Sequence, residues 1–249
     1  MKRLLFGHLI VLMTLTPMLH AQSDYVSLLI SAYGSLPNGD FAKKVGANPI
    51  LTRRAGFDVG NDVGLAKAGY GGGIELNTPV LVNGLDWVIN LRFLANSTDP
   101  TTAEAEFEHF MGDSVDLIYE TGTWINIPVM TGLRYEYQLL PYLGAAVFLQ
   151  GGINFSKAAS RSGTIGDVKA EETTFEFARD FGYELGLSLS LFKKWRLGLS
   201  YLSLNTPRYE GSRTLSEKVF PEIFSRENKI LGEERSVSMY VISLGYHLF

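Results

Sequence analysis

The sequence contains no cysteine among its 249 residues. This absence excludes disulfide bonds, thiolate metal sites and a lipid-modified N-terminal cysteine. Histidine is also scarce, and beyond the first twenty residues only His109 and His247 remain. His109 lies in an acidic polar stretch, and the nearest serine in phase with His247 is Ser243, which is too distant along one strand for a direct hydrogen bond. We therefore predict no catalytic residue, no metal site and no cofactor.

Basic runs and long apolar runs are missing as well. The formal net charge is −4, and a mildly acidic chain without a basic patch is a poor partner for nucleic acid. After the N-terminal segment, no stretch of about eighteen consecutive apolar residues occurs. A helical membrane protein is therefore excluded, which leaves a secreted or periplasmic soluble protein or a closed β-barrel.

The N-terminal segment has the features of a secretory signal. Lys2 and Arg3 precede an apolar stretch from Leu4 to Leu19, and Ala21 supplies a small residue at a cleavage point. A membrane anchor is disfavoured because the stretch is short and interrupted by polar residues and Pro17. We predict a signal peptide over residues 1–21 and an outer-membrane β-barrel domain over residues 22–249.

The clearest pattern is a hairpin formed by residues 181–191 and 195–204. Large apolar residues alternate with Gly, Ser and single charges in both arms. Side chains of a strand point alternately to its two faces, so each arm has one apolar face and one small or polar face. A face of Gly and Ser suits a crowded interior, and each arm has the length that a tilted strand needs to cross a bilayer.

Seven connections of alternating length join the strands that this pattern predicts. The predicted strands are residues 25–34, 68–78, 85–96, 124–137, 142–156, 181–191, 195–204 and 235–249. Four polar stretches, 35–67, 97–123, 157–172 and 205–234, are predicted to be long loops, and the other three connections are short. Short turns on one side and long loops on the other are typical of outer-membrane barrels. The predicted fold is therefore all-β, a closed antiparallel up-and-down transmembrane β-barrel of eight strands, with both termini on the short-turn side.

Two local features refine the strand prediction. Asn83-Gly84 indicates a two-residue type I′ turn. Pro128 lies within a predicted strand, and because proline cannot donate a ladder hydrogen bond, we expect a bulge or a missing bond there.

Several segments carry a family likeness. They are residues 34–41 (Gly-Ser-Leu-Pro-Asn-Gly-Asp-Phe), residues 126–129 (Asn-Ile-Pro-Val), the hairpin above, and the ending Leu-Gly-Tyr-His-Leu-Phe. With these, the chain resembles the small eight-stranded outer-membrane β-barrels, the OmpA/OmpX-like and "porin family" proteins. The resemblance implies a cell outer membrane location and assembly by the barrel-insertion machinery, which reads a C-terminal aromatic strand. The corresponding assembly signal here is Tyr246, Leu248 and Phe249, with Leu248 in the slot of the usual final aromatic and Phe249 out of phase.

The two faces of the predicted strands carry different residues. Membrane-facing aromatic residues are Trp87, Phe93, Tyr135, Tyr183, Trp195, Tyr201 and Tyr246. Inward charged residues are Glu75, Arg92, Arg134, Glu136, Glu184 and Arg196. The interior of an eight-stranded barrel is barely wider than its own side chains, so these charges must pair. A two-residue turn at Asn83-Gly84 would set Glu75 opposite Arg92, and we predict that this pair helps to plug the lumen.

These features predict a non-enzymatic barrel with a structural or surface-interaction role and a lumen plugged by salt bridges. The alternatives are a narrow porin or transport channel, an outer-membrane lipid-modifying enzyme, and a soluble periplasmic β-barrel. The expected partners are outer-membrane lipid, lipopolysaccharide, the insertion machinery and a surface partner bound through the long loops. The protein itself is expected to be a monomer.

Overall fold

The computed structural model describes residues 26–42, 64–80, 82–101, 117–166, 168–219 and 222–248. The predicted signal peptide over residues 1–21 and the terminal Phe249 lie outside these ranges. No helix in the described ranges is both long and apolar enough to span a bilayer.

Eight antiparallel strands close into a barrel, as predicted. In chain order they are β1 (Ser27–Asn38), β2 (Ala66–Pro79), β3 (Leu85–Thr98), β5 (Thr123–Leu140), β6 (Leu143–Lys157), β9 (Phe177–Leu191), β10 (Trp195–Ser203) and β13 (Ser238–His247). Around the barrel the order is β1-β13-β10-β9-β6-β5-β3-β2, and β2 pairs with β1 to close the ring. A short 3-10 helix, η1 (Gly39–Phe41), follows β1.

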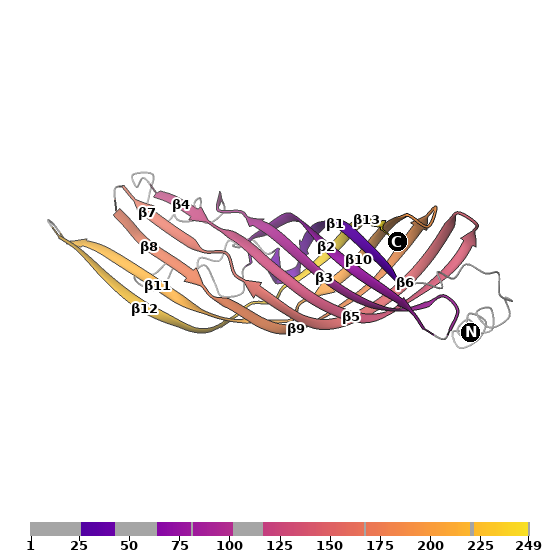
Figure 1. Cartoon of the computed structure of the whole chain (residues 1–249). Coiled ribbons are helices and arrows are strands. Elements are labelled where there is room, and N and C mark those ends of the chain that lie inside the picture. Colours follow the sequence, from indigo (N-terminus) through magenta and orange to yellow (C-terminus); the bar gives the residue numbers. More distant parts are fainter. Residues whose placement is uncertain are drawn as a thin grey trace, which may run out of the picture.

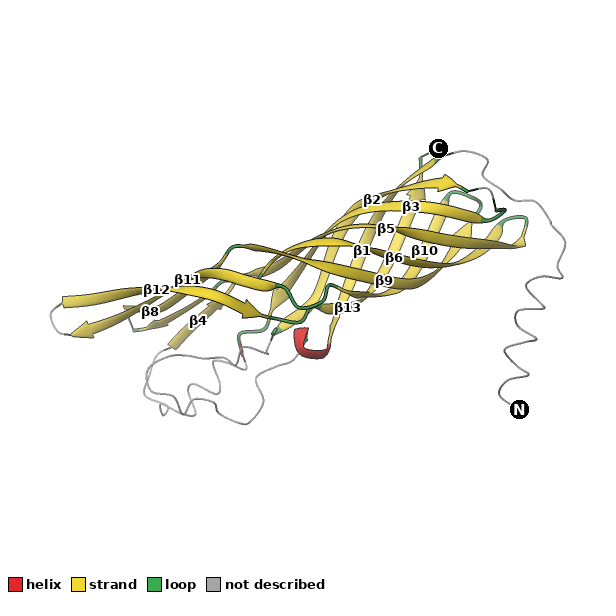
Figure 2. Cartoon of the chain, turned by 90° about the horizontal axis from the view of Figure 1, so that it is seen from below, coloured by secondary structure: helices red, strands yellow, loops and turns green. Residues whose placement is uncertain are grey.

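A second sheet rises from the barrel and was not predicted. It consists of β4 (Leu117–Thr121), β7 (Arg161–Ile165), β8 (Val168–Phe175), β11 (Arg208–Val219) and β12 (Glu222–Glu234). Its order, β12-β11-β8-β7-β4, follows that of the barrel strands β13, β10, β9, β6 and β5, which it continues. We call it the extension sheet; Figures 1 and 2 show it prolonging the barrel wall away from the rim where β13 ends.

The prediction of long loops over 97–123, 157–172 and 205–234 is therefore wrong in part. These stretches contain strands with polar residues on both faces, for example Glu172 and Thr174 on one face of β8 and Thr173 on the other. A strand without a membrane or a core on either side has no apolar period of two, so the pattern that revealed the barrel strands was missing here.

The short connections and the described chain ends share one rim, as predicted. The His247 amide donates to the Lys194 carbonyl over 2.8 Å, and the Leu248 amide donates to the Leu28 carbonyl, also over 2.8 Å. Between β9 and β10, Phe192 and Lys193 have φ values of 52° and 57°. Positive φ at both central residues is the geometry of a type I′ turn, although neither residue is a glycine or an asparagine.

A turn forms at Asn83-Gly84, where the Leu85 amide donates to the Val82 carbonyl at 3.0 Å, but the predicted type I′ geometry is wrong. Only Gly84 has a positive φ, of 77°, and the strands already separate after the Pro79–Asp86 pair. The longer connection moves the register by two residues and places Glu75 opposite Asn90 instead of Arg92. The prediction for Pro128 is confirmed: pairing of β5 with β3 is interrupted between Val129 and Asn126, while the register on either side is unchanged.

Candidate functional site

The outer face of the barrel is an apolar belt bounded by aromatic residues. Leu185, Leu187 and Leu189 are 44% to 60% exposed on β9, although a soluble protein would bury such a row. All seven predicted membrane-facing aromatic residues lie on this outer face. Near the short-turn rim, the rings of Trp195 and Tyr246 meet edge to face at 4.9 Å. Such a belt fits a bilayer, with the aromatic residues at its interfaces.

Replacing Leu187 by Arg tests this belt. The side chain lies between Leu185 and Leu189 and is 60% exposed. An arginine near the bilayer midplane costs about 2 to 4 kcal/mol. We expect urea unfolding of the variant in lipid vesicles to report a loss of that size. Thr214→Arg, on the extension sheet beyond the belt, is the control and should change stability little; equal losses for both variants would contradict the membrane belt.

Inside the barrel, two buried ion pairs cross the lumen. The Arg92 guanidinium on β3 faces the Glu184 carboxylate on β9, with Nη2–Oε2 and Nη1–Oε1 distances of 2.7 and 2.8 Å. The Arg196 guanidinium on β10 pairs with Glu75 on β2. The predicted Glu75–Arg92 pair is therefore wrong. Each charge has a partner on a strand that is distant in the sequence, and the register of one hairpin cannot reveal such partners.

Neutral side chains connect these pairs. Asn90 accepts a hydrogen bond from Arg92 Nε at 2.8 Å and donates one to Glu75 Oε2 at 3.2 Å. Ser200 donates to Glu184. The Arg92 guanidinium also makes a cation–π contact with Tyr33, whose ring centre lies 4.8 Å from Arg92 Cζ.

Arg134 occupies the end of the lumen nearest the short turns. It pairs with Glu136 on its own strand, lies 3.6 Å from the Asp86 carboxylate, and donates to Ser190 Oγ at 3.1 Å. We call eight of these polar residues the charge network. They are Glu75, Asp86, Asn90, Arg92, Arg134, Glu136, Glu184 and Arg196. Three arginines face four carboxylates in the network, so the buried charge is nearly balanced.

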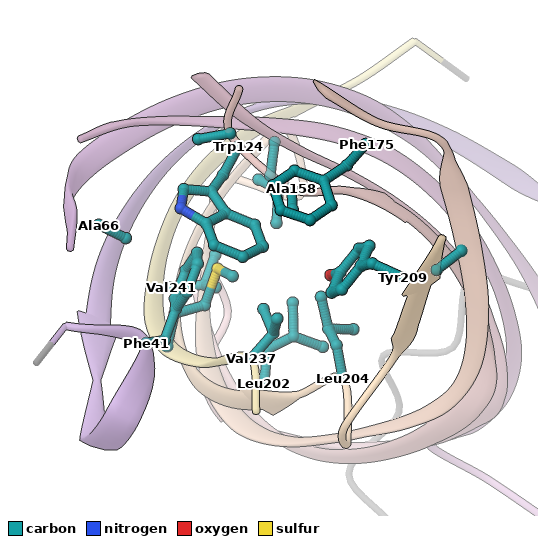
Figure 3. Packing of buried hydrophobic residues seen from close by; sticks show 14 of the residues in the cluster. Phe41, Ala66, Trp124, Ala158, Phe175, Leu202, Leu204, Tyr209, Val237 and Val241 are labelled. Carbon is teal, nitrogen blue, oxygen red and sulfur yellow. The ribbon is translucent and has the colours of Figure 1, made fainter. Parts of the chain in front are cut away.

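The other end of the lumen is closed by buried apolar side chains. We call these the apolar cap, and Figure 3 shows them pointing into the ring of strands. The Trp124 ring lies at its centre, 5.2 Å from the Phe41 ring and 5.8 Å from the Tyr209 ring, both in edge contacts. Phe175 packs against Tyr209 at 6.1 Å. The aliphatic members of the cap include Leu202 and Val237.

The polar atoms of the cap rings are also satisfied. Trp124 Nε1 donates to the Gly64 carbonyl at 2.9 Å. The hydroxyls of Tyr209 and Ser156 lie 2.6 Å apart, and burial raises the pKa of Tyr209 above its ordinary value. Phe41 comes from η1, and Phe175 and Tyr209 come from the extension sheet, so the cap ties both elements to the barrel. Sequence analysis missed the cap because these residues lie singly in polar stretches.

A small cavity lies within the charge network. It has a volume of about 20 Å³ and is lined by residues such as Tyr33, Arg92, Gln150 and Ser188. This volume is of the order needed for a single water molecule. His247, the one histidine among the described residues, has its Nε2 atom 3.1 Å from Arg196 Nη2.

Comparison with known proteins bears on the fold. No family model and no curated protein matches the sequence. Among solved structures, the N-terminal β-barrel domain of Pseudomonas aeruginosa OprF is similar at 10% identity and a TM-score of 0.38, over 89% of this chain and 97% of that domain. A major outer membrane protein of Thermus thermophilus gives 11% identity and a TM-score of 0.48, over 90% of this chain and 100% of that one. Neisserial surface protein A is similar at 9% identity and a TM-score of 0.38, over 89% of this chain and 95% of that one. By its own strand pairing and apolar belt, the chain has the fold of a small eight-stranded outer-membrane β-barrel, enlarged by the extension sheet.

Proposed function

We propose that this protein is a non-enzymatic barrel of the cell outer membrane that carries a folded platform, the extension sheet, to the surface. The observation that supports this proposal is the side chains inside the barrel. Buried arginine–carboxylate pairs cross the lumen near the short turns, and the apolar cap lies beneath the extension sheet, so we infer that the lumen is closed at both levels. A barrel whose lumen is closed at both ends can serve as a membrane anchor. The extension sheet is then the part of the protein that is available to contact partners.

A narrow channel is the main alternative, and conductance distinguishes the two. A path for ions would have to cross both the buried arginine–carboxylate pairs and the packed rings around Trp124. We expect the purified protein, inserted in planar bilayers and shown to be folded by its heat-dependent gel mobility, to give no discrete current steps. Reproducible openings of defined size would overturn the proposal. The alternative of a lipid-modifying enzyme would be recognised by a mass change in envelope lipids upon expression.

Location and assembly belong to the same proposal. Tyr246 and Leu248 both lie on the outer face, at 36% and 49% exposure, and a C-terminal strand with outward apolar residues suits recognition by the insertion machinery. The belt would contact outer-membrane lipid and lipopolysaccharide. Fractionation tests this: the mature protein should require detergent for extraction. Recovery in the soluble fraction would favour a soluble periplasmic barrel instead.

A further inference from the structure

The turn between β9 and β10 combines a strained backbone with exposed side chains. Phe192 and Lys193 both have positive φ, a conformation that glycine and asparagine adopt at lower cost. The Phe192 ring is nevertheless 69% exposed, so burial within the protein does not explain a phenylalanine there. Backbone strain of this kind is concentrated at functional positions. The turn therefore points to a contact outside the chain.

Four aromatic rings lie around this turn on the short-turn rim. The Phe192 ring stacks on the Tyr142 ring with 5.9 Å between centroids, and the Trp195 ring meets that of Tyr246 at 4.9 Å. The Phe192 amide also donates to the Tyr142 carbonyl at 2.8 Å, which holds the turn against the start of β6. All four rings are exposed and continue the apolar belt. Aromatic rings at the edge of such a belt lie at the level of the lipid headgroups.

Two lysines add positive charge to these rings. The side chains of Lys193 and Lys194 are exposed, and neither forms an ion pair with another residue of the described ranges. The other two short connections, residues 80–84 and 138–142, contain no charged residue. Positive charge is therefore confined to one side of the rim. We call the two lysines and the four rings the rim patch.

The acidic side chains in the described part of this rim do not offset the lysines. They belong to Asp86 and Glu136, and both lie against Arg134 inside the barrel. Their carboxylates are therefore engaged in the lumen, whereas the lysines lie outside it on the turn. The rim patch thus presents a net positive charge beside exposed rings.

We propose that the rim patch binds the headgroup of an anionic phospholipid in the leaflet on the short-turn side, which faces the periplasm in such barrels. A lysine ammonium on its flexible stem attracts a phosphate as a point charge. A zwitterionic headgroup brings its own ammonium beside the lysines, so an anionic headgroup fits better. The acyl chains of the same lipid would lie along the belt below Trp195, against Leu197, which is 48% exposed.

The continuity of the patch with the belt determines the source of the phosphate. A free anion would use the lysines alone, whereas a lipid uses the lysines, the rings and the belt together. This inference rests on the proposed contact of the belt with outer-membrane lipid and names one lipid class and its site.

Quenching of Trp195 fluorescence by brominated lipid tests the inference, because Trp195 directly follows Lys194. All proteins carry Trp87→Phe, and Trp124 is 1% exposed, so Trp195 is the tryptophan that lipid can reach. The folded full-length protein is placed in phosphatidylcholine vesicles that contain brominated phosphatidylglycerol or, for reference, brominated phosphatidylcholine. We expect the anionic lipid to bind about fivefold more tightly, the factor for one lysine near an anionic surface, and this preference to fall with added salt.

Lys193→Gln/Lys194→Gln should bring the two lipids to equal quenching. The matched control, Lys169→Gln/Lys229→Gln, removes the same charge from the extension sheet, away from this leaflet, and should keep the preference. Phe192→Asn/Lys193→Gly supplies residues that suit positive φ, and it should weaken the preference. Loss of binding in this variant cannot be ascribed to a disrupted turn. Heat-dependent gel mobility establishes that each variant is folded.

Three results would overturn the inference. They are equal quenching by both lipids in the protein with both lysines, a preference that survives Lys193→Gln/Lys194→Gln, and equal losses in that variant and its control. Extraction of the mature protein without detergent would instead overturn the proposed lipid contact of the belt. Current steps in planar bilayers would overturn the closed lumen and leave the lipid preference standing.

Discussion

Glu184→Ala should destabilise the barrel by about 3 to 5 kcal/mol, the cost of leaving one charge of a buried pair without its partner. The Glu184 and Arg92 side chains are 1% and 3% exposed, so water cannot replace the lost carboxylate. Unfolding by urea in lipid vesicles measures the loss. Glu184→Gln is the matched control: it keeps the size and an acceptor for Ser200, and isolates the effect of the charge.

A double-mutant cycle identifies the partner. Arg92→Ala/Glu184→Ala should cost clearly less than the sum of its single variants, because the second substitution removes the charge that the first left unpaired. Arg92→Ala/Glu75→Ala should be closer to additive, since Glu75 pairs with Arg196 and reaches Arg92 through Asn90. A larger coupling for Glu75 than for Glu184 would contradict the pairing described here and restore the pair expected from the sequence.

The contrast between these two cycles shows what the sequence could determine. Alternation with a period of two identified the barrel strands and the inward phase of Glu75, Arg92, Glu184 and Arg196. It could not choose partners, since the side chains that meet across the lumen depend on the closure of the whole ring. The hairpin rule also failed locally, because the turn at Asn83-Gly84 is not of type I′ and lies within a longer connection that follows the Pro79–Asp86 pair.

The extension sheet and the cap were missed for a related reason. By register, one face of the sheet carries Arg161 and Arg213 and the other carries Glu120 and Glu172, so both faces are polar and the sequence resembles a loop. The cap combines Phe41, Trp124 and Tyr209 from elements far apart in the sequence. Trp124 is in the inward phase of its strand, but only the folded ring shows that the other aromatic residues converge on it.

The apolar cap should be the second region where one substitution has a large effect. Trp124→Ala removes a ring that is 1% exposed and in contact with Phe41 and Tyr209, and it should cost about 3 to 5 kcal/mol. Trp87→Ala is the matched control. This ring is 46% exposed on the outer face, where lipid can fill the vacated space, so its loss should be smaller.

The same pair of variants tests how the lumen is closed. If the charge network closes it independently of the cap, folded Trp124→Ala should still give no current steps in planar bilayers, because the pairs of Arg92 and Arg196 remain. Resistance to protease should fall instead in the extension sheet, since Phe175 and Tyr209 pack against the cap and would lose their support. Equal losses of stability for Trp124→Ala and Trp87→Ala would show that the cap does not hold the sheet to the barrel.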